Sequence, residues 1–120
     1  MTLAATLAVV AVAVLHLYFL VLEMFLWTTP YGRRTFSTTP EAAASTRVLA
    51  ANQGLYNGFL AAGLGWGLAQ GGDGRAVETF FLVCVVVAGL FGAATASRKI
   101  LFAQALPGLV ALVLVRLAPP

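Results

Sequence analysis

Long apolar runs separated by short polar stretches make up most of this chain. Four runs are continuous enough to be helices, and none shows the period of two that strands of a membrane barrel require. About 20 apolar residues in a helix cross the ~30 Å hydrocarbon core of a bilayer. The pattern therefore predicts an all-α, four-transmembrane-helix bundle forming one domain over residues 1–120, with helices over about 3–27, 40–69, 77–96 and 100–117.

The polar stretches predict where these helices begin and how they connect. Thr39, Pro40 and Glu41 are typical of a helix start: Thr caps, Pro suits the first turn, and Glu meets the positive end of the helix dipole. We therefore expect the second helix to extend into the cytoplasmic interface before it enters the membrane. The short connection at 97–99 makes the last two helices antiparallel neighbours. Pro107 predicts a kink in the fourth helix.

Composition excludes several classes of protein. Hydrophobic residues make up 61% of the chain and charged residues 9%, too apolar for a soluble domain and too poor in charge for a disordered one. A single cysteine, Cys84, cannot form an internal disulfide, and one Cys with one His cannot build a zinc site. We expect no metal and no cofactor.

The basic residues predict orientation rather than nucleic-acid binding. Positively charged loops stay in the cytoplasm. This rule places both termini on the periplasmic side of a bacterial inner membrane, in a multi-pass arrangement. Five of the seven basic residues then lie on the cytoplasmic side: Arg33, Arg34, Arg47, Arg98 and Lys99.

Polar side chains within the apolar runs are the candidate functional residues, because ionisable groups are costly in a membrane. His16 and Glu23 lie two helical turns apart on one face and form a candidate acid–base pair. Depth estimates put Asn57 level with His16, and most of the other polar groups nearer the cytoplasm. We therefore expect a polar pocket open to the cytoplasm. Its candidate ligand-binding residues are Asn52, Gln53, Tyr56, Asn57, Thr95 and Gln104.

Each of these residues also has a purely structural interpretation. His16 and the amide side chains can serve as interhelical hydrogen-bonding groups. Glu23 can form an ion pair with Arg47 at the inner interface. One metal ion bound by both His16 and Glu23 is disfavoured, because their Cα atoms lie ~10.5 Å apart along the helix.

Small residues at four-residue spacing predict close helix contacts. The stripes contain Gly54 and Gly58 in the second helix, and Gly89 and Gly92 in the third. They serve either packing inside one bundle or the contact surface of a homo-oligomer.

Three stretches resemble a bacterial family of small four-helix membrane proteins, domain of unknown function 1304. They are LHLYFLVLEMFLWTTPYGRRTF (15–36), LAANQGLYNGFLAAGL (49–64) and GAATASRKILFAQALPG (92–108). The resemblance implies four membrane helices and a bacterial inner membrane. It supplies no activity, so no catalytic residue is carried over. Ala105 departs from the family pattern, which favours Gly after the glutamine of the fourth helix.

Three functions remain open at this point. The leading one is binding, or acting on, an amphipathic, lipid-like small molecule, with membrane lipid as a partner. The alternatives are a proton-coupled small-molecule transporter working as a dimer, and a non-catalytic partner subunit. Enzymatic activity is undecided: loss of ligand on substitution of His16 would favour the first function, and proton release dependent on Glu23 the second.

Overall fold

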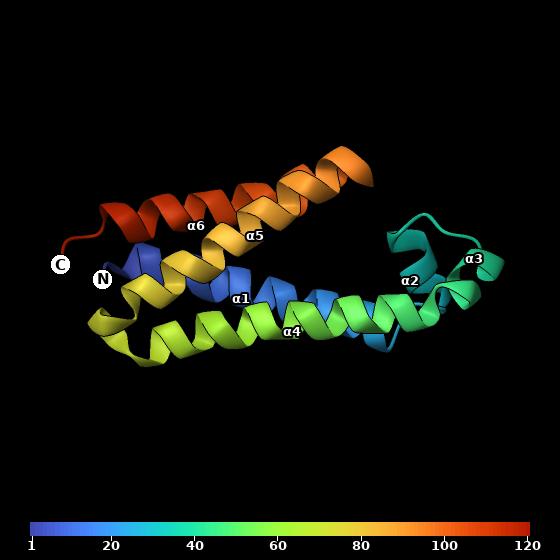
Figure 1. Ribbon diagram of the computed structural model, residues 1–120, viewed down its shortest axis with the longest axis horizontal. Helices are drawn as coiled ribbons and strands as arrows, with labels where there is room; N and C mark the ends of the chain where they lie inside the picture. Colours follow the sequence, from blue (N-terminus) through green and yellow to red (C-terminus); the bar gives the residue numbers. More distant parts are fainter. The chain divides into compact units, whose positions relative to one another are not determined.

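The computed structural model describes residues 1–120 and contains helices but no strands (Figure 1). The all-helical prediction is confirmed. The α-helices are α1 (Leu3–Met24), α2 (Pro30–Thr35), α3 (Pro40–Ser45), α4 (Arg47–Ala69), α5 (Arg75–Thr95) and α6 (Leu106–Leu117). A 3-10 helix, η1 (Gly71–Gly74), precedes α5, and a π-helix, η2 (Leu101–Ala105), precedes α6.

The chain comprises two compact units. Unit 1 contains Met1–Ala13 and Leu60–Pro120, and unit 2 contains Val14–Phe59. Helices α1 and α4 each contribute one part to both units. Each unit is described by itself below.

Unit 1 has an apolar core built from small and branched side chains. Core positions recur three or four residues apart, which is the spacing of one helix face. The fully buried members are Ala5 and Val9 of α1, Leu64 of α4, Leu82 and Val85 of α5, and Ala111 and Val115 of α6.

Helices α5 and α6 form an antiparallel hairpin within unit 1, as the short connection predicts (Figure 1). Their contact is close at Gly89, where a Cβ atom would lie 2.7 Å from the backbone nitrogen of Ala105. The Gln104 side chain donates a hydrogen bond of 3.2 Å to the Val85 carbonyl. The close contact at Gly89 and the hydrogen bond from Gln104 therefore hold η2 against α5.

The helix that contains Pro107 is widened rather than regular. A π-helix covers Leu101–Ala105, and the Leu106 N–H donates to the Leu101 carbonyl. Proline lacks an N–H, and its ring crowds the carbonyl four residues earlier. A wider turn directly before Pro107 accommodates that carbonyl, which accounts for the π-helix at this position.

Unit 2 contains the end of α1, the start of α4 and the connection between them. Thr29 caps α2 and Thr39 caps α3, each accepting a hydrogen bond from the backbone N–H three residues later. The predicted start of the second helix at Pro40 is thus confirmed. Two details differ: α1 ends at Met24 instead of Trp27, and the connection contains the short helix α2.

The predicted helix over 40–69 is interrupted at Thr46, which separates α3 from α4. The Thr46 and Ser45 hydroxyls both donate to the Ala42 carbonyl, at 2.7 and 3.0 Å. Such bonds from Ser and Thr to an earlier carbonyl compete with the helical ladder and bend helices. Local side-chain bonding is therefore the physical reason for the break.

Two helical segments are long and apolar enough to cross a membrane, Leu3–Met24 and Gly71–Thr95. The segment Leu101–Leu117 is apolar but shorter. Helix α4 has 23 residues, yet it carries Asn52, Gln53 and Asn57 and does not qualify by composition. By length and composition the structure thus supports two spans, fewer than the four predicted.

The four glycines expected at contact seams all face atoms of this chain. A Cβ atom on Gly54 would lie 2.5 Å from Met24 Cγ, and one on Gly58 would lie 2.8 Å from Leu20 Cδ1. Gly89 meets Ala105, and a Cβ atom on Gly92 would lie 3.2 Å from Ile100. Packing within the chain thus accounts for these contacts, and the homo-oligomer stays a prediction.

We predict that Gly89→Ala destabilises the protein by about 1–3 kcal/mol, because the new methyl group would meet the backbone of Ala105. Thermal unfolding in mild detergent, followed by circular dichroism, measures the change. Gly65→Ala is the matched control: nothing lies within 4 Å of its Cβ position, so it should be neutral or stabilising by up to ~1 kcal/mol. Equal stability of the two variants would contradict the close contact.

Candidate functional site

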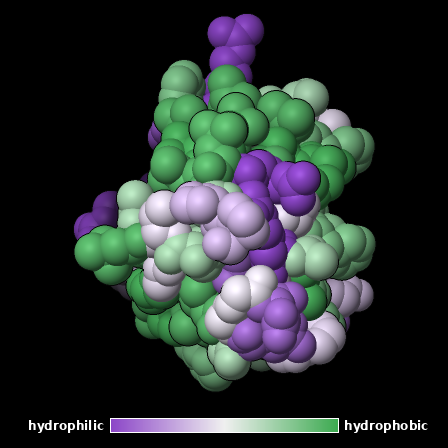
Figure 2. Space-filling model, turned by 90° about the vertical axis from the view of Figure 1, so that its left-hand side faces the viewer, coloured by the Kyte–Doolittle hydropathy of each residue, from purple (hydrophilic) through white to green (hydrophobic).

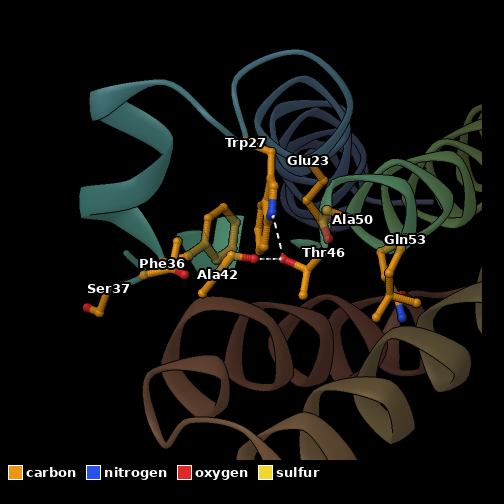
Figure 3. Close-up of a pocket in the computed structure, with 10 residues that line it drawn as sticks. Glu23, Trp27, Phe36, Ser37, Ala42, Thr46, Ala50 and Gln53 are labelled. Carbon is orange, nitrogen blue, oxygen red and sulfur yellow. Dashed lines mark hydrogen bonds between the residues drawn. The ribbon is translucent and has the colours of Figure 1, made fainter. Parts of the chain in front are cut away.

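Unit 2 contains a pocket of about 400 Å³ where α1, α3, α4 and the connection around α2 converge (Figure 3). The walls combine aromatic and aliphatic side chains with a few polar ones. The ten lining residues are Glu23, Trp27, Phe36, Ser37, Thr38, Ala42, Thr46, Leu49, Ala50 and Gln53.

Trp27 forms one wall and joins the end of α1 to the α3–α4 break. Its indole N–H donates to the Thr46 hydroxyl at 3.1 Å, and that hydroxyl donates to the Ala42 carbonyl (Figure 3). The Trp27 and Phe36 rings pack with centroids 4.8 Å apart. The interruption at Thr46 thus supplies the hydroxyl that holds this wall in place.

Glu23 provides the carboxyl group of the pocket. Its side chain is half-buried, and Oε1 accepts a hydrogen bond of 2.5 Å from Asn57 Nδ2. The close approach of α1 and α4 at Gly54 permits this bond, since a Cβ atom there would lie 3.2 Å from Glu23 Cβ. The structural partner of Glu23 is therefore Asn57, whereas the sequence suggested Arg47.

This bond also corrects the predicted register. Depth estimates placed Asn57 level with His16, but the structure places it level with Glu23. Asn57 lies near the middle of α4, whereas Glu23 lies near the end of α1. The two helix centres are therefore offset, whereas the depth estimate assumed that they lie level.

Ser37 lies at the pocket with a left-handed backbone, φ 52°. It follows the last turn of α2, where the Ser37 N–H bonds to the Arg34 carbonyl and the Thr38 N–H to the Arg33 carbonyl. These two bonds form a Schellman motif, which usually has glycine at the left-handed position. A serine here costs backbone energy, and such strain gathers at functional sites.

The other candidate residues of unit 2 lie outside the lining. His16 is buried, and its ring packs edge-on against the Phe19 ring, with the ring centroids 5.4 Å apart. Asn52 is exposed and donates to the Val48 carbonyl of its own helix. Tyr56 is exposed and packs beside Phe59. Of the predicted set, the structure brings together Glu23, Asn57 and Gln53.

Thr95 and Gln104 belong to unit 1. The Thr95 hydroxyl donates to the Phe91 carbonyl of its own helix, and Gln104 donates to Val85. Both side chains therefore have structural partners, which is the structural interpretation that the sequence left open for them.

Sequence reasoning missed a buried carboxyl group in unit 1. Glu78 in the first turn of α5 is fully buried, and neither carboxyl oxygen has a hydrogen-bond partner. It packs over Gly67, whose Cβ position lies 2.6 Å from Glu78 Cγ. The signal was present, because a carboxylate within an apolar run is costly. It was overlooked because Glu78 lies at the predicted edge of its helix.

Polar groups also gather at the end of unit 1 that carries the two termini and η1 (Figure 2). There Arg75 donates to the Arg116 carbonyl, which joins the start of α5 to the end of α6. Apolar side chains surround these groups in the same view. This mixture is typical of a helix end at a membrane interface.

Comparison with known proteins gives the family. The family model described as "Protein of unknown function (DUF1304)" matches residues 10–116. The chain belongs to this family. It is also similar to "Uncharacterized protein YpaA" of Lactococcus lactis subsp. lactis (strain IL1403), with 27% identity over 115 residues, 94% of this chain and 97% of that protein. No solved structure matches. The resemblance deduced from the three sequence stretches is confirmed.

We predict that Ser37→Gly stabilises the protein by about 1 kcal/mol, because glycine adopts the left-handed conformation without strain. Thermal unfolding measures the change. Ser45→Gly in α3 is the control and should destabilise, since glycine weakens a helix. A loss of stability in both variants would contradict the strain at Ser37.

We further predict that Glu78→Met stabilises the protein by about 1–3 kcal/mol, because it removes a buried polar group that has no hydrogen-bond partner. Glu41→Met, at an exposed position in the first turn of α3, should instead be slightly destabilising. Both are measured by thermal unfolding. Destabilisation by Glu78→Met would mean that the carboxyl group has a stabilising partner in solution.

Proposed function

We propose that this protein is a four-span bacterial inner-membrane protein whose unit 2 pocket binds an amphipathic small molecule. The pocket supports the proposal most directly, because one carboxyl group and one amide lie among aromatic and aliphatic walls. Ligand sites are usually cavities of about 300–1,000 Å³ with mostly apolar walls and a few placed polar groups. A volume of about 400 Å³ falls within that range.

Surface exposure supports the membrane assignment. Only 28% of the apolar window in Leu3–Met24 and 22% of that in Gly71–Thr95 is buried in the fold. A core helix of a soluble protein would be mostly buried, whereas these helices present large apolar side chains outward. Lipid would cover this surface.

The two remaining segments also suit a bilayer in this proposal. Helix α4 would be about 35 Å long, and Asn57 and Asn52 have hydrogen-bond acceptors on Glu23 and Val48. Leu101–Leu117 would be ~25 Å long and would need slight thinning of the bilayer. The positive-inside rule then directs the pocket, which lies beside the loop of Arg33 and Arg34, toward the cytoplasm.

Binding is proposed rather than catalysis or assembly. The two residues of the candidate acid–base pair do not share the pocket, because Glu23 lines it and His16 does not. The glycine seams that favoured a partner subunit are filled by residues of the same chain. A dimeric proton-coupled transporter would need the same pocket, so ligand binding is the step to test first.

Trp27 allows binding to be measured directly. Trp66→Phe leaves Trp27 as the only tryptophan, since the chain has two. We predict that dodecyl maltoside, added below its micelle concentration to this variant in lipid nanodiscs, changes Trp27 fluorescence saturably. Native mass spectrometry of the same protein in mild detergent should show a retained amphipathic molecule and report the oligomeric state.

Ala50→Phe should abolish the saturable change, because Ala50 is 4% exposed and lines the pocket, so that a phenyl ring there would occupy the pocket. Ala44→Phe introduces the same side chain at an exposed position of α3 outside the lining, and should bind normally. Absence of saturable binding in the parent protein, or equal binding in both variants, would refute the pocket as a ligand site.

A further inference from the structure

We infer that the headgroup recognised by this pocket is cationic, an amine or a quaternary ammonium group attached to an apolar chain. The inference rests on the proposed function and adds the chemical class of the ligand. It depends on three features of the pocket. The lining has no basic side chain, the second carboxyl oxygen of Glu23 can still accept a hydrogen bond, and one wall is aromatic.

The lining contains one carboxyl group and no basic side chain. Glu23 is the only ionisable acid or base among the ten lining residues, which include no Lys, Arg or His. The basic side chains of unit 2, Arg33, Arg34 and Arg47, are not among them. An anionic headgroup would face a carboxyl group with no basic side chain in the lining, whereas a cationic headgroup could form an ion pair with Glu23.

Hydrogen bonding leads to the same headgroup. Asn57 occupies Oε1 of Glu23 and orients the carboxyl group, while Oε2 keeps its capacity to accept. The Trp27 N–H, which would otherwise suit an anion, is already donated to Thr46. The Thr46 hydroxyl in turn donates to Ala42. The Trp27 N–H and the Thr46 hydroxyl thus donate their hydrogen bonds within the protein. The second oxygen of the Glu23 carboxyl group remains able to accept one from a ligand.

The aromatic wall provides the second part of a cation site. The Trp27 and Phe36 rings both line the pocket and pack together at 4.8 Å. Aromatic faces attract ammonium groups, and tryptophan does so most strongly. A carboxyl group beside paired aromatic rings is therefore a recognition element for an ammonium group. Three other lining side chains can each donate and accept hydrogen bonds, so they suit a polar headgroup of either charge: Gln53, Ser37 and Thr38.

Three probes with the same dodecyl chain test the headgroup: dodecyltrimethylammonium, dodecyl maltoside and dodecyl sulfate. Each is titrated below its micelle concentration into the Trp66→Phe protein in neutral-lipid nanodiscs, with Trp27 fluorescence as the readout. The cationic probe should bind about tenfold more tightly than the neutral one, and the anionic probe more weakly than both. The preference for the cation should shrink as salt is raised.

Glu23→Gln should remove the preference for the cationic probe over the maltoside, because a neutral amide cannot form an ion pair with an ammonium group. The amide keeps an oxygen that can accept from Asn57. Glu41→Gln removes a carboxyl group outside the lining and should keep the preference. Equal affinities for the three probes, or a cation preference that survives Glu23→Gln, would overturn the inference and leave the ligand pocket intact. Absence of saturable binding for every probe would overturn both.

Discussion

The hydrogen bond from Asn57 to Glu23 is the interaction on which unit 2 depends. It is the contact that pairs a polar side chain of α4 with the end of α1, and it forms where Gly54 lets the two helices approach. In an apolar setting an unpaired carboxyl or amide group costs several kcal/mol, so this pair also specifies which turns of α1 and α4 face each other.

The pocket follows from how the chain continues on both sides of that bond. Beyond Glu23 the helix ends at Met24, and Trp27 turns back to bond with Thr46. Thr46 can accept this bond because the helix is interrupted there, with its hydroxyl directed at the Ala42 carbonyl. The strained turn at Ser37 then brings Phe36 against Trp27. The pocket is thus lined by a helix end, a helix break and a capped turn, which are the irregular parts of the unit.

These irregular parts are also where the sequence was least informative. Apolar runs predicted the long helices, and Thr39 with Pro40 predicted a helix start, because propensity and capping act between neighbouring residues. The break at Thr46 has a local cause as well, but its function depends on Trp27, 19 residues earlier. The partner of Glu23 is 34 residues away and depends on how far α1 and α4 are offset along their axes. The depth estimate assumed level helix centres and was wrong by the distance from His16 to Glu23, ~10.5 Å of helix, because nothing in the local sequence specifies that offset.

The two units place their carboxyl groups differently: Glu78 of unit 1 is fully buried, whereas Glu23 of unit 2 lines the pocket. Unit 1 buries an apolar core, and its interhelical amide, Gln104, bonds to a backbone carbonyl. Such a bond serves packing and leaves nothing for a ligand. Unit 2 instead directs a carboxyl group and an amide to the lining of a pocket and adds backbone strain at Ser37. Serine at the left-handed position of the turn costs backbone energy that glycine would avoid. The open pocket and this strained turn are therefore the features of unit 2 on which the proposed ligand site rests.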